Sequence, residues 1–185
     1  YKRINIMKLE SASGGYVMNV NKEGRGETIA VTVASVEHFS EYGGYAFAWS
    51  NVTYDPDAAD TIILIKNDHT TKKLHIKEIE FASDTASEVI VHLTNGATFT
   101  PTGTAITGVN LNNAVGGVPL ATAKGDETAN TQGNIVFHTK VLANTPNHWD
   151  MSGAIILGTN QSIGVDLVTA ATAAFVTIWG FYSDV

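Results

Sequence analysis

The residues best suited to metal binding or proton transfer are six histidines, and they are scattered along the chain. No HExxH or HxH pattern joins any of them. His75 and His92 fall on predicted strands that can be neighbours, and a sheet brings distant residues together. A two-histidine site is one interpretation of this pair. Ordinary solvated or hydrogen-bonded side chains are the other, and we favour it.

Three carboxylates in DPDAAD, those of Asp55, Asp57 and Asp60, have a spacing that suggests a calcium loop. Such loops need more oxygen ligands and usually a glycine at the sharp turn, but Ala59 is the fifth residue here and no glycine follows. We favour a proline-containing turn that leads into the next strand near Asp60.

Other candidate catalytic groups are weaker. GDET (125–128) and NHWD (147–150) hold acids and a histidine, but we place them in loops, where solvated acids are common. Ser162 lacks the surrounding GxSxG of a nucleophile elbow, and the glycines of 14–26 match no phosphate-binding loop. We therefore expect no enzyme activity, no catalytic residue, no metal and no cofactor.

Aromatic side chains are dense at Tyr45, Phe47 and Trp49, which alternate along one predicted strand. Aromatic rings on a sheet face can stack on sugars, and they are also effective core residues. The period of two favours a core or an interface over a sugar site.

The composition favours association. Of the 185 residues only 16% are charged, against about a quarter in ordinary domains, and the formal net charge is −7. The acidic balance argues against nucleic-acid binding. No run approaches eighteen apolar residues, so we expect no membrane span. The absence of cysteine excludes disulfides and thiolate metal sites.

The basic residues crowd toward the start of the chain. Five of the eleven lie in the first 25 residues: Lys2, Arg3, Lys8, Lys22 and Arg25. They suggest either an arm that reaches onto an acidic neighbour or a solvated tail. In the first case these five residues contact another subunit or a capsid.

The apolar pattern has a period of two almost throughout, which is typical of strands. Eight strands are predicted to begin near Asp60, Lys73, Glu88, Thr104, Asn134, Gly153, Ser162 and Ala173. A change of phase at Lys77–Glu78 predicts a β-bulge, and the turn at 158–161 predicts a hairpin over 153–169. Eight strands with one long connection predict an all-β protein, an antiparallel β-sandwich of jelly-roll type. Residues 45–185 form this domain, and residues 1–44 form an N-terminal strand-rich arm.

The long connection, residues 112–132, is rich in small uncharged residues. Loops of this length in a compact domain are usually functional or mobile. It carries apolar side chains that would be costly to leave in water: Val115, Val118, Pro119 and Leu120. We expect these residues to lie against another subunit and not to enclose an active site.

Three segments resemble tailed-bacteriophage virion structural proteins, of the jelly-roll capsid decoration (cement) type. They are FAWSNVTYDPDAADTIILIKND (47–68), FTPTGTAITGVNLNNA (99–114) and GAIILGTNQSIGVDLVTAATAAFVTIWGFY (153–182). The likeness covers about residues 45–182 and consists of strand and turn motifs.

The resemblance implies a structural role on the surface of a virus (phage) capsid. The partners would be the chain itself, as a homotrimer, and the major capsid protein or another virion protein. The alternative is a carbohydrate-binding β-sandwich, on a fibre or tail or as a secreted module.

Overall fold

A computed structural model describes residues 9–11, 14–16, 19–20, 26–27, 39–40, 43–51, 60–100, 103–114, 116–128 and 132–184. The chain divides into two compact units, Tyr1–Val33 and Ala34–Val185. The predicted boundary after residue 44 stays a prediction.

The first unit contains two small antiparallel sheets. β1 (Leu9–Ser11) pairs with β2 (Gly14–Tyr16), and β3 (Asn19–Val20) pairs with β4 (Gly26–Glu27). The described residues of this unit all lie in strands, whereas its role as an arm stays a prediction.

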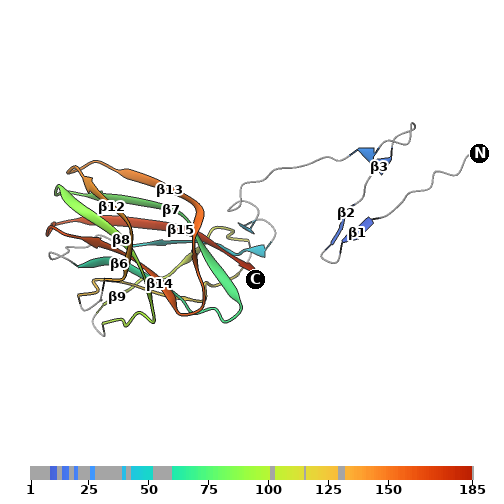
Figure 1. The fold of residues 1–185 in the computed structure, drawn as a ribbon, viewed down its shortest axis with the longest axis horizontal. Coiled ribbons are helices and arrows are strands. Elements are labelled where there is room, and N and C mark those ends of the chain that lie inside the picture. Colours follow the sequence, from blue (N-terminus) through green and yellow to red (C-terminus); the bar gives the residue numbers. More distant parts are fainter. Residues whose placement is uncertain are drawn as a thin grey trace, which may run out of the picture. The chain divides into compact units, whose positions relative to one another are not determined.

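The second unit, called the sandwich domain below, contains two antiparallel sheets (Figure 1). The five-stranded sheet has the order β10 (Val109–Asn110), β5 (Ala46–Ser50), β15 (Ala174–Asp184), β7 (Lys72–Ser83) and β13 (Asn147–Leu157). The six-stranded sheet has the order β12 (Asn134–Val141), β8 (Ser87–Asn95), β14 (Gln161–Leu167), β6 (Thr61–Asn67), β11 (Ala121–Gly125) and β9 (Thr104–Ala105).

The pairing is that of a jelly roll, in which a long hairpin of strand pairs is rolled into two sheets. β5 pairs with β15, β6 with β14, β7 with β13, and β8 with β12. The predicted β-sandwich of jelly-roll type is confirmed. One of its eight strands differs from the prediction, because β5 takes the first place and the segment at Thr104 forms only short additions, β9 and β10, in different sheets.

The predicted bulge in β7 is confirmed. Glu78 lies opposite Trp179 of β15 while Ile76 lies opposite Gly180, so Lys77 is the extra residue. The bulge returns both Ile76 and Ile79 to the core although three positions separate them.

The predicted hairpin over 153–169 is wrong. The turn is present, since the backbone N–H of Gln161 donates to the Gly158 carbonyl at 3.1 Å. The strand before the turn, β13, pairs with β7 in one sheet, and the strand after it, β14, pairs with β6 and β8 in the other. Turn residues predict a chain reversal, but they do not determine which sheet receives the next strand.

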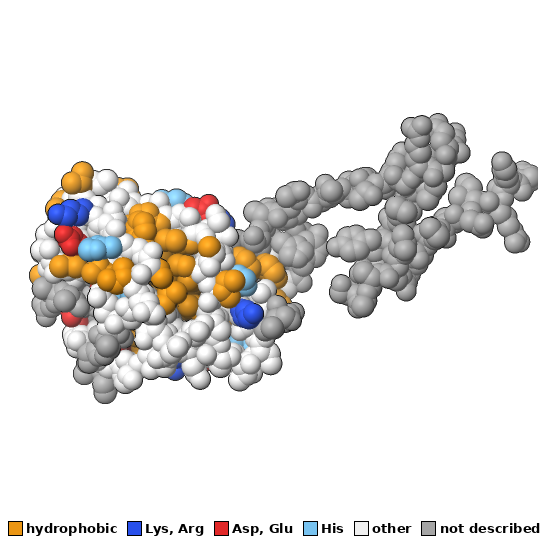
Figure 2. All heavy atoms as spheres, in the orientation of Figure 1, with side chains coloured by type: hydrophobic (Ala, Val, Ile, Leu, Met, Phe, Trp, Pro, Cys, Tyr) orange, Lys and Arg blue, Asp and Glu red, His pale blue; other side chains and the backbone are white. Residues whose placement is uncertain are grey.

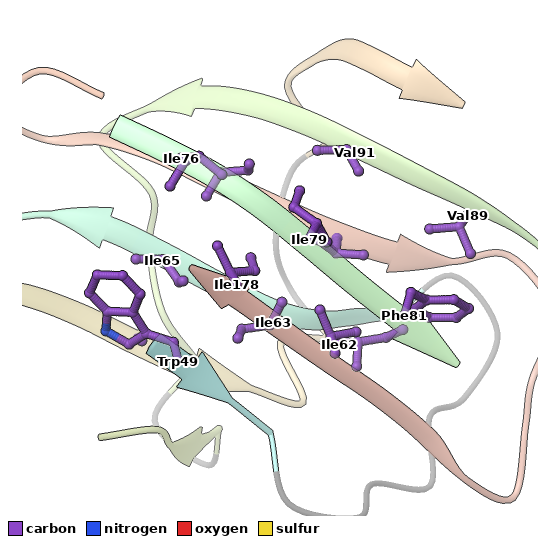
Figure 3. Packing of buried hydrophobic residues seen from close by; sticks show 14 of the residues in the cluster. Trp49, Ile62, Ile63, Ile65, Ile76, Ile79, Phe81, Val89, Val91 and Ile178 are labelled. Carbon is purple, nitrogen blue, oxygen red and sulfur yellow. The ribbon is translucent and has the colours of Figure 1, made fainter. Parts of the chain in front are cut away.

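The core lies between the two sheets (Figure 3). Both sheets contribute fully buried aliphatic side chains, such as Ile63 and Val91 from one and Ile76 and Ile178 from the other. Each such side chain contributes about 1.5–3 kcal/mol on burial. Phe47 and Trp49 are also buried here, which confirms the core interpretation of the alternating aromatics, whereas Tyr45 is exposed beneath the ammonium group of Lys72.

Candidate interaction surface

The two sides of the sandwich domain end differently. On one side, called the closed side below, the whole segment between β8 and β12 (residues 96–133) adds β10 beside β5 and β11 and β9 beside β6. This longer segment is called the connection from here on. On the other, called the open side, the long strands β12 and β13 end their sheets. The connection therefore bridges the edges of both sheets on the closed side only.

Asparagine side chains hold the connection against the domain. The Asn110 side-chain amide donates to the carbonyls of Gly44 at 2.9 Å and Gly117 at 3.1 Å. The Asn112 amide donates to the carbonyl of Ser40 at 2.8 Å. These contacts join described parts of the connection to each other and to the segment that precedes β5.

Close packing completes the closed side. A Cβ atom placed on Gly108 would lie 2.5 Å from Nε1 of Trp49 and 2.6 Å from Cγ of Pro119. Only glycine at this position lets the connection approach the buried indole.

The outer surface of the connection is apolar. Val118 is 76% exposed, Val109 63% and Leu120 52%, and Leu111 is also exposed. We call these four residues the connection stripe. The two segments that carry the stripe lie together. The Asn110 side chain donates to the Gly117 carbonyl, and Pro119 packs beside Gly108.

Two of the four predicted contact residues on the connection, Val118 and Leu120, thus have exposed side chains, and Pro119 is half-buried. Val115 lies outside the described residues, as do the five basic candidates Lys2, Arg3, Lys8, Lys22 and Arg25. Val109 and Leu111, which belong to the predicted strand at Thr104–Leu111, were not among the predicted contact residues.

An acid expected to be solvated is buried beneath the connection. Glu127 is 1% exposed, and its Oε2 accepts the backbone N–H of Thr100 at 2.5 Å. Lys124 donates to the Thr100 carbonyl at 3.0 Å, so both side chains hold this part of the connection. The interpretation of GDET as a solvated loop is wrong, because β11 ends at Gly125 and Glu127 bridges to Thr61 of β6.

A buried polar network lies on the outer face of the six-stranded sheet. His92 Nδ1 accepts the backbone N–H of Gly133 at 3.1 Å, so the ring proton must be on Nε2, which lies 3.0 Å from Asp166 Oδ1. Thr61 donates to the same oxygen at 2.7 Å, and Gln132 donates to Oδ2 at 3.0 Å. Both ring nitrogens are occupied, and the network fixes the start of β12 to three strands.

The two-histidine interpretation, which we did not favour, is wrong. His75 lies on β7 and His92 on β8, which belong to opposite sheets. His75 stacks on Phe181 with ring centroids 4.9 Å apart, and Phe39 stacks on the same ring at 4.6 Å. Among the described residues no group of three or more His, Asp or Glu side chains could hold a metal. Asp55 and Asp57 of DPDAAD lie outside them.

Both strands of the open side are interrupted. Val136 is a bulge in β12 between the paired residues Ile135 and Phe137. In β13 the register shifts between Asp150 and Ile155, so the intervening residues arch away from β7. Bulges at an exposed edge hinder the addition of a further strand.

Asp150 stabilises the arch in β13, so NHWD is not the loop that we predicted. Its carboxylate accepts the Lys77 ammonium at 2.7 Å and the backbone N–H of Ser152 at 2.6 Å. The hydrogen bond from Lys77, followed by the one from Ser152, lowers the pKa of Asp150. The same bond with Asp150 raises the pKa of Lys77.

Between the open edges, an aromatic cluster bridges the two sheets. Trp149 of β13 packs against Phe137 of β12 with ring centroids 4.5 Å apart, and it stacks on Phe81. Further out, Glu88 interacts with His138 at 3.1 Å and Lys140 at 3.4 Å. The hydrogen bond from His138, followed by that from Lys140, lowers the pKa of Glu88.

Exposed apolar side chains are also present on the open side, where they include Ile135, Val136, Leu142 and Ile156. Figure 2 shows hydrophobic side chains gathered over the middle of one face of the sandwich domain. Large exposed apolar patches commonly mark interaction sites. No helix among the described residues is long and apolar enough to cross a membrane.

No protein-family model matches this chain, and no curated protein is significantly similar to it. Fold and surface chemistry therefore carry the functional argument.

Proposed function

We propose that this chain is a structural component of a phage particle, and more narrowly a decoration (cement) protein on the capsid surface. It packs there as a homotrimer against the major capsid protein or another virion protein and stabilises the shell. The support is the jelly-roll architecture, which capsid proteins use widely, together with the low charge density. Because lectins and cupins share this fold, the fold alone does not distinguish these functions, and the surface residues have to.

The connection stripe is the observation that carries the proposal. Its four aliphatic side chains lie on a segment that is held rigid by asparagine bonds and by glycine packing. A rigid apolar surface loses little conformational entropy when it binds. Covering one Val or Leu side chain contributes about 1.5–3 kcal/mol, so four of them give a sizeable contact.

The basic arm supplies the second contact in this proposal. Its residues Lys2, Arg3, Lys8, Lys22 and Arg25 would meet an acidic surface of the capsid shell or of a neighbouring subunit. Two modest contacts on one subunit, repeated in a trimer, reinforce each other because every bound subunit raises the effective concentration of the next.

Light scattering coupled to size-exclusion chromatography tests the association. We expect a stable trimer for the full chain and a monomer for Val118→Lys/Leu120→Lys, with the melting temperature unchanged. Val136→Lys/Leu142→Lys is the matched control, since it places the same two charges on an exposed valine and an exposed leucine of the open side. A monomeric wild type, or a trimer that survives the double substitution, contradicts the role of the connection stripe.

A deletion of residues 1–33 tests the arm. The cut spares Phe39, which stacks on Phe181, and Ser40, which accepts the bond from Asn112. We expect the shortened chain to melt like the full one and to lose binding to phage particles, as seen by particle pull-down and electron microscopy of labelled protein. Undiminished binding of the shortened chain rules out the arm as the attachment segment.

A further inference from the structure

A pocket whose described lining residues are uncharged lies where β8 ends and β12 and β14 begin. Its volume is about 540 Å³, which is within the range of small-molecule sites. Among the described residues, four polar side chains line it, those of Thr94, Asn95, Asn134 and Gln161, and Leu93 and Ile156 add apolar surface.

The walls of this pocket are held in place by hydrogen bonds. Gly133, in the wall, donates its backbone N–H to the buried His92. A Cβ atom on Gly133 would lie 2.0 Å from the Leu93 carbonyl oxygen, so glycine permits this close approach of the chain to β8. On the opposite wall Gln161 Oε1 accepts the backbone N–H of Gly158 at 2.7 Å. The pocket is therefore formed before any ligand arrives.

Hydrogen-bonding groups in the pocket are available to a ligand. Gln161 uses its Oε1 within the fold, which leaves its Nε2 amide group to donate. Asn95 and Asn134 have exposed side chains, and each amide offers two N–H donors and one carbonyl acceptor.

We infer that the pocket binds a neutral saccharide. A sugar ring offers hydroxyl groups that both donate and accept, which suits amides, and C–H surface that suits Ile156 and Leu93. Anionic and cationic ligands are disfavoured, because the described residues that line the pocket include no Lys, Arg, His, Asp or Glu. The inference does not depend on the particle role proposed above.

An extended peptide is the competing ligand, since it also bonds to amides. It would have to pair with the free edge of β12 beside the pocket. The bulge at Val136 breaks the register of that edge two residues after Asn134, so a bound strand could not continue. A saccharide needs no such continuous edge.

Titration of the ¹⁵N-labelled full chain tests the inference. The probes are maltotriose, cellotriose and N,N′,N″-triacetylchitotriose as neutral sugars, a heparin tetrasaccharide as a charged one, and an uncharged hexapeptide of alternating Thr and Val. We expect at least one neutral sugar to shift the side-chain amide signals of Asn95, Asn134 and Gln161 with a Kd of about 1 mM or below. If all three neutral sugars leave these signals unmoved, or if only the peptide or the heparin fragment moves them, the inference is wrong.

Matched substitutions locate the site. Asn134→Asp replaces two donors with an acceptor at nearly constant shape, and we expect the Kd for the responding sugar to rise about tenfold or more. Asn113→Asp makes the same change of charge at an exposed position of the connection, outside the pocket, and should leave the Kd unchanged. Equal losses in the two variants would show that the sugar binds elsewhere and would overturn the assignment.

Discussion

The closed and open sides of the sandwich domain protect the edges of the two sheets in different ways. On the closed side the connection covers the edges of β5 and β6 with short strands and fills the space above Trp49. On the open side β12 and β13 remain long and uncovered, but each is interrupted by an irregularity in register. Covering and bulging are both natural protections against edge-to-edge aggregation.

The difference has a consequence for association. The closed side presents a rigid apolar surface, whereas the open side presents apolar residues on strands whose backbone pairing is already broken. Contacts on either side must therefore be made mainly by side chains. The connection stripe lies on the segment that Asn110 and Asn112 bind to the domain, which is why the proposed subunit contact is placed there.

Two tryptophans give the largest expected contrast between the sides. Trp49 on the closed side is fully buried, and Trp149 on the open side is half-buried. Trp49→Ala should lower the free energy of unfolding by about 3–5 kcal/mol. Trp149→Ala should lower it by about 1–2 kcal/mol, because less of its area leaves water on folding. Urea denaturation measures both.

If Trp49→Ala does not fold, Trp49→Phe gives a milder test. The indole N–H of Trp49 has no hydrogen-bond partner among the described residues, so phenylalanine removes an unpaired donor along with the lost volume. Equal losses for the two alanine variants would mean that the two sides are packed alike.

Two histidines that contact different parts of β12 give the next contrast. His92 of β8 bonds to Gly133, just before β12, and His138 lies in the middle of β12. His92→Ala removes the acceptor of the Gly133 N–H and one of three hydrogen bonds to the Asp166 carboxylate, at a cost of about 2–3 kcal/mol. His138→Ala removes an exposed contact to Glu88 and should leave stability nearly unchanged. Hydrogen exchange at Gly133 should accelerate in the first variant alone, and unchanged exchange there would show that the network does not hold β12.

Substitutions at two glycines test how tightly the connection packs on the closed side. Gly108→Ala forces a Cβ atom against the rigid rings of Trp49 and Pro119 and should cost about 1–3 kcal/mol. A Cβ atom on Gly116 meets nothing within 4 Å, so Gly116→Ala serves as the control. Thermal melting of the two variants measures the difference, and a neutral Gly108→Ala would show that the connection can lift away without loss.

The smallest effect concerns the arch in β13. Because the bonds from Lys77 and Ser152 lower the pKa of Asp150, this carboxylate adds stability above the ordinary aspartate pKa. The stabilisation by Asp150 is lost as the pH falls through its lowered pKa, below about pH 4. Asp150→Asn should make the stability less dependent on pH in this acid range.

Glu88→Gln provides a comparison for the Asp150 variant, since the pKa of Glu88 is also lowered on the same side of the domain. Denaturant midpoints between pH 2 and pH 6 measure both variants. If Asp150→Asn follows the wild-type pH profile, the arch does not depend on this carboxylate.

Local patterns in the sequence predicted much of the fold. Alternating residues placed Phe47 and Trp49 in the core, and the change of phase in β7 placed the bulge at Lys77. These features depend on neighbouring residues only, because the pleat of a strand fixes which side chains share a face.

The sequence did not predict which strands pair with each other. The turn at 158–161 looked like a hairpin, yet it carries the chain from one sheet to the other. The burial of Glu127 and His92 was not predicted either, since each accepts a hydrogen bond from a backbone N–H far away in the sequence. Nothing in the sequence around either residue distinguishes it from a solvated polar side chain.

The sequence by itself therefore determined an all-β chain, the faces of its strands, a basic N-terminal segment and an apolar connection. Tertiary structure alone decided that this connection closes one side of a jelly roll and turns Val118 and Leu120 outward. The physical reason is that the hydrophobic pattern acts along each strand, whereas the order of strands in a sheet is set by contacts between distant segments.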